Sequence, residues 1–276
     1  MAEFLRARRA RLTPRDVGLP AGQRRRLPGL RRQEVAELAA VSVDWYTRLE
    51  QGRVGAPGAA VLDALAQALL LSEQERQHLH LIARGDSPAP RHRSAPVSAS
   101  LRTMLAGMPL LPAYVIDFRF DVLARNEAAA AVLGAEFGFG AATNAARLLF
   151  LEPSTRLTQL DWASVAPETV GNLRANLARH SDDARLRELI SELCRDSPDF
   201  AGWWQHQTVR ELSHGRKRIR HPSGCELTVY YDALDTHDNS DQCLIVLTPA
   251  DQETERNLRS IVGRHSQQLT RPAIVA

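Results

Sequence analysis

Hydrophobic and polar positions repeat with helical spacing through the first 83 residues, and the pattern becomes mixed after residue 98. It predicts five short helices, over residues 3–12, 31–39, 43–51, 59–70 and 73–83. The last helix follows Ser72, and Glu75 three residues later predicts a capping box. Five short helices in one stretch of this length indicate a compact all-α domain.

A segment rich in proline and charge, "RGDSPAPRHRSAPVS" (84–98), shows no periodicity and predicts a linker. We therefore expect a first domain over residues 1–84, a linker over 85–98, a second domain over 99–266 and a tail over 267–276. A chain of 276 residues is long enough for two such domains.

The second domain begins with patterns for a lead-in helix, "SASLRTMLAGM", two short strands around a turn, "AYVIDFRFDVLARN", and a short helix, "EAAAAVLG". Residues 162–206 are helical in pattern, because Leu186, Leu189, Ile190 and Leu193 form one apolar face. Pro198 is placed to begin the next helix, where its missing N–H does no harm.

The remainder of this domain has the pattern of strands. "TVREL" and "KRIRH" are predicted strands around a "SHGR" turn, and residues 222–224 predict a second turn. "CELTVYYDAL" and "QCLIVLTP" predict two more strands, before a closing helix over residues 252–265. Strands, then helices, then antiparallel strands indicate an α+β domain with a curved antiparallel sheet.

Two of the predicted helices, 31–39 and 43–51, have the spacing of a helix-turn-helix, in which the second helix enters the major groove of DNA. Ala36 provides the small residue where the helices cross, and Ala40 stands in the turn. Tyr46 and Leu49 face the core together with Val41. A charged helical hairpin with a solvated face would lack this combination of small, turn and apolar positions.

The exposed face of the second helix carries side chains that can read base edges, since arginine suits guanine, a carboxylate the cytosine amino group and a threonine methyl thymine. We expect Asp44, Thr47 and Arg48 to form this set, with Val43 at its flank. Ser42 is predicted to cap the helix and to direct its backbone amides at a phosphate. The predicted phosphate contacts come from Arg24, Arg25, Arg26, Arg31 and Arg32.

The distribution of charge supports this interpretation. The chain carries a formal net charge of +3, but its first 32 residues hold ten arginines against Glu3 and Asp16, a local charge of +8. A basic N-terminal segment followed by a mildly acidic remainder is typical of a protein that binds a polyanion at one end. Of the 35 basic residues only Lys217 is lysine, a bias typical of a GC-rich genome, so the evidence lies in the clustering.

The stretch "GLRRQEVAELAAVSVDWYTRLEQGR" resembles the XRE-type (lambda-repressor-like) helix-turn-helix of a bacterial regulator family, in which it is joined to an MmyB-like ligand-binding domain. "PAYVIDFRFDVLARNEAAAAVLG", "RLLFLEP", "DSPDFAGWWQHQTVRE" and "RKRIRHPSGCELTVYYDAL" resemble that second domain. The resemblance implies a PAS-like fold and a small apolar ligand, with a fatty acid as the leading candidate. Ala40 departs from the family's usual glycine, at a cost of up to ~1 kcal/mol if the turn needs positive φ.

A carboxylate-bearing lipid would need an apolar tunnel with a buried arginine or histidine at its end. The alternatives are a helix cap for Asn126, a solvated charge for Arg125 and core packing for the tryptophans. Our candidate ligand-binding residues are Tyr114, Arg125, Asn126, Arg147, Trp162, Trp204 and His206.

Other chemistry finds no support in the sequence, which has no G-x-S-x-G elbow, Walker loop or H-E-x-x-H motif. His78 and His80 point to different faces of a helix, the three cysteines are widely spaced, and His221 is placed at a strand end to bond to backbone. We therefore expect no enzyme, no metal and no cofactor. No apolar run reaches ~20 residues and no signal peptide is present, so we expect a cytoplasmic protein, nucleoid-associated when bound to DNA.

Together these patterns predict a sequence-specific regulator, homodimeric on a palindromic operator, whose second domain binds a small apolar ligand. Two alternatives stay open. The helix-turn-helix could carry a small-molecule enzyme to DNA, or the second domain could serve only to dimerise. A polar catalytic constellation would favour the former, and the absence of any cavity the latter.

Overall fold

The computed structural model describes residues 1–20, 29–83, 96–134, 137, 143–210, 214–236 and 241–270. It divides into two compact units. Unit 1 comprises Met1–Arg91, Val170–Asp183 and Ala201–Glu211, and unit 2 comprises His92–Thr169, Ala184–Phe200 and Leu212–Ala276. Unit 1 therefore includes two segments that follow the predicted linker in the sequence.

The first 83 residues contain the five predicted helices, and each end lies within two residues of its prediction. A 3₁₀ helix, η1 (Pro14–Val17), lies between the first two of these helices. The Ser72–Glu75 capping box is confirmed, with the Ser72 N–H donating to Glu75 at 3.0 Å and the Glu75 N–H to Ser72 at 3.3 Å. The helices are α1 (Ala2–Arg11), α2 (Arg32–Leu38), α3 (Val43–Glu50), α4 (Ala59–Ala68) and α5 (Glu73–Ala83).

The core of unit 1 forms where the apolar faces of these helices meet. Phe4 and Leu5 of α1, Tyr46 of α3 and Leu65 of α4 are almost completely buried in one cluster. The cluster also holds Ala175 and Val209, which come from the two later segments of the same unit. Helical spacing thus produces the core that the apolar pattern predicts.

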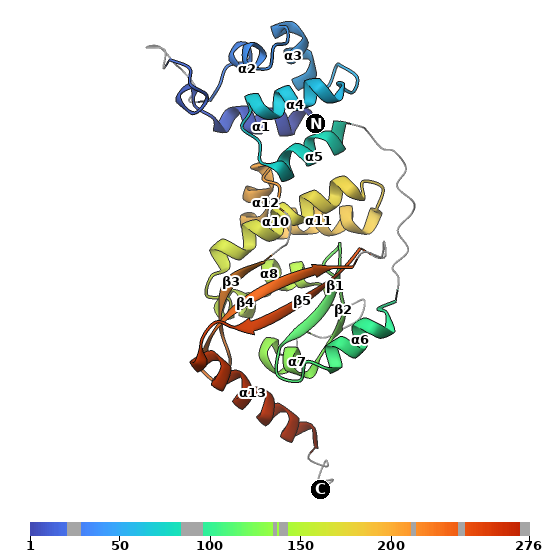
Figure 1. The fold of residues 1–276 in the computed structure, drawn as a ribbon, viewed down its shortest axis with the longest axis vertical. Coiled ribbons are helices and arrows are strands. Elements are labelled where there is room, and N and C mark those ends of the chain that lie inside the picture. Colours follow the sequence, from blue (N-terminus) through green and yellow to red (C-terminus); the bar gives the residue numbers. More distant parts are fainter. Residues whose placement is uncertain are drawn as a thin grey trace. The chain divides into compact units, whose positions relative to one another are not determined.

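Unit 2 is built on one antiparallel sheet of five strands in the order β2-β1-β5-β4-β3 (Figure 1). The two short strands around a turn, the lead-in helix and the short helix after them are confirmed. The elements are α6 (Ala99–Ala106), β1 (Ala113–Asp117), β2 (Val122–Arg125), α7 (Glu127–Leu133), β3 (His214–Arg220), β4 (Glu226–Asp235) and β5 (Gln242–Pro249). The α+β prediction with an antiparallel sheet is therefore confirmed.

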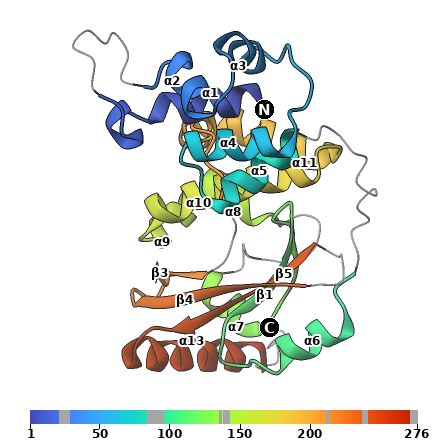
Figure 2. The ribbon, with the colours of Figure 1, turned by 45° about the horizontal axis from the view of Figure 1, so that its top comes forward.

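The remaining helices lie before β3 and after β5. Figure 2 shows α13 along one face of the sheet, where it packs against β4 and β5, with α8 and α9 on the opposite side. Helix α10 supplies residues 162–169 to unit 2 and 170–179 to unit 1. These helices are α8 (Ala145–Leu151), α9 (Pro153–Thr158), α10 (Trp162–Arg179), α11 (Ala184–Asp196), α12 (Pro198–Gln205) and α13 (Gln252–Thr270). None of the described helices combines the length and apolar character needed to cross a bilayer.

Alternation along the strands gives the sheet two different faces. On one face, Val115, Leu244 and Val246 are buried in a cluster with Leu101 and Leu105 of α6. The alternate residues of each strand point to the other face of the sheet. Tyr114 of β1 pairs there with Ile245 of β5, and Lys217 of β3 pairs with Val229 of β4. This second face carries the cavity described below.

Three details of the predicted strands and tail were wrong. His214, Gly215 and Arg216 of the predicted "SHGR" turn lie within β3, and residues 208–210 of "TVREL" form no strand. Gly215 serves close approach and not a turn, because a Cβ there would meet the Tyr231 ring at 2.6 Å. The predicted tail also begins inside a helix, since α13 continues to Thr270. The turn over residues 222–224 is confirmed, with Gly224 at φ 89°.

Candidate nucleic-acid interface and ligand cavity

Helices α2 and α3 lie next to each other in unit 1, joined by a short turn (Figure 1). Ala40 has a φ of 53°, the left-handed conformation that glycine adopts at lower cost. The N–H of Val41 donates to the carbonyl of Ala36 at 2.9 Å, and the N–H of Ala40 to that of Glu37 at 3.1 Å. The turn is thus hydrogen-bonded even though an alanine occupies its strained position.

The start of α3 is fixed by Ser42, whose Oγ accepts a hydrogen bond from the N–H of Trp45 at 3.2 Å. The predicted N-cap is therefore confirmed. Tyr46 and Leu49 are fully buried on the inner side of the helix. Because these two side chains set its rotation, residues 180° away on the wheel must face outward.

The outer side of α3 carries the predicted base-reading residues. Asp44 and Arg48 are exposed, Thr47 is half-buried and Val43 is 43% exposed. Neither the Asp44 carboxylate nor the Arg48 guanidinium makes a hydrogen bond or an ion pair with another residue of the described chain. Their hydrogen-bonding groups can therefore reach a partner without first breaking an internal contact.

A buried ion cluster holds the other end of α3. The Glu50 side chain is fully buried, and its carboxylate accepts from Arg9 at 2.6 Å and from Arg32 at 2.8 Å. Burial alone would raise the pKa of Glu50, but the hydrogen bonds from Arg9 and Arg32 outweigh it and lower the pKa. Arg9 also donates to the carbonyl of Leu30 at 2.7 Å, which ties α1 to the start of α2.

The arginines predicted to contact phosphates differ in their surroundings. Arg32 is held by Glu50 through Nε, with 43% of its side chain exposed, and exposed Arg31 donates its backbone N–H to Glu34 at 2.6 Å. Arg24, Arg25 and Arg26 lie outside the described residues. Their role on DNA stays a prediction.

Unit 2 contains a cavity of about 390 Å³ between the second face of the sheet and helices α7–α10. This volume lies within the range of small-molecule sites, roughly 300–1,000 Å³. Apolar side chains form most of its wall, among them Ile116, Phe120, Val132, Phe137, Leu149 and Ile245. The cavity therefore suits a ligand with a large apolar part.

Polar residues interrupt this wall at Ser154, Thr155, Thr158, Gln159, Glu168, Thr169, Lys217, Arg220 and Tyr231. We call four of them, Gln159, Glu168, Lys217 and Tyr231, the polar wall. The Tyr231 hydroxyl donates to Glu168 at 2.9 Å, and the Lys217 Nζ lies 5.4 Å from the centroid of the Tyr231 ring. The Oε1 atom of Gln159 is buried and has no hydrogen-bond partner in the described chain. Our sequence reasoning missed all four residues.

One of the seven predicted ligand-binding residues, Tyr114, lines the cavity. It is buried, and its ring packs edge-on against Phe137 at a centroid distance of 4.7 Å. Burial raises the pKa of its hydroxyl above the ordinary value. Tyr114 is thus a neutral, mostly apolar part of the wall.

Asn126 and Arg125 lie outside the cavity. The Asn126 side chain caps α7 by accepting from the Ala129 N–H at 2.9 Å, and it donates to the carbonyls of Met108 and Leu111, each at 2.8 Å. The helix-cap alternative therefore describes Asn126. Arg125 pairs with Tyr114 across β1 and β2 but is not part of the wall.

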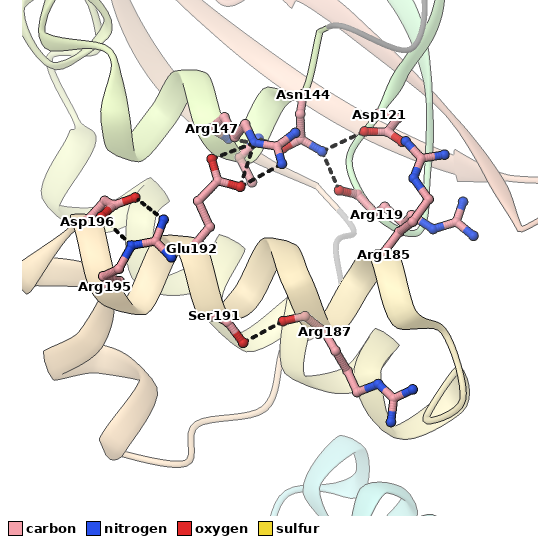
Figure 3. Close-up of polar contacts among 11 residues, drawn as sticks. Arg119, Asp121, Asn144, Arg147, Arg185, Arg187, Ser191, Glu192, Arg195 and Asp196 are labelled. Atoms are coloured by element: carbon pink, nitrogen blue, oxygen red, sulfur yellow. Dashed lines mark hydrogen bonds and ion pairs between the residues drawn. The ribbon is translucent and has the colours of Figure 1, made fainter.

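Arg147 and Trp162 also make structural contacts in unit 2. Figure 3 shows Arg147 turned toward Glu192 of α11, which it binds through Nε at 2.9 Å and Nη2 at 2.6 Å. The Trp162 indole donates to the carbonyl of Leu149 at 2.9 Å, and the Arg156 guanidinium stacks on its ring at 4.1 Å. Neither side chain lines the cavity.

Trp204 and His206 belong to unit 1, whereas every residue of the cavity wall belongs to unit 2. The Trp204 ring lies 4.0 Å from the guanidinium carbon of Arg174, which also hydrogen-bonds to the Trp204 carbonyl. His206 is exposed. Trp204 is half-buried and packs on Arg174 within unit 1, so it does not line the cavity.

The described histidines form no metal site. His80 Nε2 lies 2.7 Å from Asp63, His78 packs on Phe4 at 5.2 Å, and His221 Nε2 bonds to the carbonyl of Ala131 at 3.0 Å as a strand-end residue. Among the described residues, no group of three or more histidine, cysteine, aspartate or glutamate side chains could hold a metal ion.

Comparison with known protein families agrees with this geometry. A family model described as the MmyB-like transcription regulator ligand binding domain matches residues 97–261, which is more than half of the chain. A second family model, described as a helix-turn-helix domain, matches residues 1–79. None of the curated proteins matches the chain.

Proposed function

Since the chain belongs to the MmyB-like transcription regulators, we propose that it binds a palindromic operator as a homodimer and that an apolar ligand, foremost a fatty acid, modulates this binding. The observation that carries the DNA-binding half is the outer face of α3, where the Asp44 and Arg48 side chains are exposed and make no polar contact with other described residues. The N-capped start of such a helix is suited to a phosphate.

The test compares two arginine variants on several DNA sequences by fluorescence anisotropy. Arg48→Ala should cost about 1–3 kcal/mol on the preferred sequence and much less on others, because it removes a contact to a base edge. Arg25→Ala should weaken binding to all sequences alike and lower the slope of affinity against salt by about one, because it removes a phosphate contact. Equal losses for both variants on every sequence would refute our assignment of the recognition face.

The homodimer follows from the way a helix-turn-helix reads DNA, because one recognition helix spans only a half-site. We expect the half-sites to lie about one helical turn apart, roughly 34–36 Å. Sedimentation of the protein with operators of altered half-site spacing tests this. Stoichiometric binding of one protein per operator, unaffected by spacing, would contradict it.

The apolar cavity supports the ligand half of the proposal. Its mainly apolar wall favours a ligand domain over one that only dimerises. Mass spectrometry of a denatured extract and thermal shift with C12–C18 fatty acids test the ligand. Purified protein that carries no small molecule and shows no thermal shift would refute it.

A further inference from the structure

Lys217 is the only lysine of the chain, and it lies in the polar wall of the cavity. Its side chain points from β3 toward the cavity and the residue is only 7% exposed. The neighbouring Arg216 and Arg218 point from the opposite face of the strand and are exposed. Lys217 is therefore the buried basic residue of β3. It carries a compact ammonium group, whereas the exposed arginines of the strand carry a broad guanidinium group.

Lys217 lies in apolar surroundings, and no described residue pairs with its positive charge. Its closest aromatic neighbour is the Tyr231 ring, and its ammonium makes no hydrogen bond or ion pair with any residue that the structure describes. Burial lowers the pKa of Lys217 to about 8, and no charged neighbour contributes to the shift. An ammonium in such a place is costly unless an anion joins it, because no carboxylate of the described chain pairs with it.

The one carboxylate of the polar wall does not provide that anion. Glu168 accepts a hydrogen bond from the Tyr231 hydroxyl at 2.9 Å, so the tyrosine ring stands between β3 and α10. Gly215 makes this arrangement possible, because any side chain there would collide with the Tyr231 ring. Strand β3 therefore holds Lys217 beside the ring, with its ammonium free to meet a ligand.

We propose that Lys217 binds the carboxylate of an apolar monocarboxylate whose hydrocarbon part fills the cavity. This inference rests on the proposed function, since it assumes that an apolar ligand enters the cavity, and it adds the residue that binds the head group of the ligand. An ammonium–carboxylate pair is a charge-assisted hydrogen bond, which is stronger than a neutral one and stronger still away from water. It identifies lysine as the anchor where the sequence had suggested arginine or histidine.

The experiment uses two ligands that differ only in the head group, tetradecanoate and tetradecan-1-ol, titrated into the full-length protein by calorimetry. We expect wild type to bind the acid at least about tenfold more tightly than the alcohol. Lys217→Met, which removes the charge and leaves an unbranched side chain one atom shorter, should lower the affinity for the acid to that for the alcohol. Its affinity for the alcohol should be unchanged, which shows that the cavity of the variant is intact.

Arg216→Met is the matched control, because it removes one positive charge from the adjacent position on the outer face of the strand. It should retain the preference for the acid. A wild type that binds both compounds equally, or a preference that survives Lys217→Met, would overturn the role of Lys217 and leave the apolar ligand standing. A wild type that binds neither compound would overturn both this inference and the proposed ligand class.

Discussion

Replacing Glu50 with glutamine would remove the only negative charge from the ion cluster at the end of α3. In the wild type, Arg9 donates to this carboxylate through Nε at 2.6 Å and Nη2 at 3.2 Å, and Arg32 donates through Nε at 2.8 Å. A glutamine side chain keeps the shape and one acceptor oxygen. It leaves two guanidinium groups facing each other without an anion between them.

The structure sets the size of the effect. Breaking a buried ion pair by removing one partner costs roughly 3–5 kcal/mol when the other charge stays buried. Here the Arg9 and Arg32 side chains are 18% and 43% exposed, so water compensates part of their charge. We therefore expect Glu50→Gln to lower the free energy of unfolding of unit 1 by about 2–3 kcal/mol.

Hydrogen exchange read by mass spectrometry measures this loss within the full chain, because it reports opening of each helix separately. Amides of α1, α2 and α3 should exchange about 30- to 140-fold faster in Glu50→Gln. Glu37→Gln is the control, since it removes the same charge from an exposed position of α2. This control should exchange as wild type does.

The pH dependence provides a second check. Because the pKa of Glu50 is lowered in the folded state, its contribution is complete above its ordinary value of 4.5 and is lost as pH falls through the folded pKa. The difference between wild type and Glu50→Gln should therefore shrink below about pH 4.5. A variant as stable as Glu37→Gln, or a difference that persists unchanged in acid, would refute the reasoning.

Three further substitutions test other parts of the structure, each by urea denaturation. Ala40→Gly should raise stability by up to about 1 kcal/mol, because glycine adopts the observed φ of 53° without strain; a loss of stability would contradict this. His78→Leu should abolish a decline in stability between pH 6.5 and 4, because burial lowers the pKa of His78 to about 4 and only the unfolded chain is protonated in that window. Asn126→Ala should cost at least about 3 kcal/mol, since it leaves the carbonyls of Met108 and Leu111 and the N–H of Ala129 without this partner, and a neutral result would show that they find other partners.

The DNA-binding helices could be predicted because their determinants are close in sequence. Ser42 caps a helix that begins at the next residue, and Ala36, Ala40 and Tyr46 fall at the spacing that a crossing pair requires. The left-handed Ala40 follows from the same spacing, although alanine itself gives no such signal. Local patterns were sufficient here.

The errors in β3 come from contacts that are distant in sequence. Histidine followed by glycine resembles a turn, but Gly215 lies opposite Tyr231 on the neighbouring strand. The position requires glycine because the Tyr231 ring occupies the space of a side chain. Nothing near Gly215 in the sequence indicates the ring. The strand therefore begins earlier than its local pattern suggests.

The ligand residues were predicted less well for the same reason. Arg147 stands where a cavity residue could stand, yet Glu192, 45 residues later, binds its guanidinium. Lys217 carried two signals in the sequence, as the only lysine and as an inward position in an alternating run. Its meaning depended on the sheet, because only the pairing with β4 places it beside Tyr231.

The position of β3 at the edge of the sheet also bears on how the protein avoids aggregation. Exposed edge strands can pair with strands of other molecules unless charge or cover prevents it. Arg218 is fixed to Asp161 at 2.7 Å and Arg220 to Glu226 at 2.8 Å, while Leu160 donates its N–H to the carbonyl of Arg218 at 3.0 Å. These anchored charges and this short cover make the edge a poor template for another strand. The proposed homodimer must then use a different surface. Valines in place of these arginines would leave the edge open to pairing with strands of other molecules.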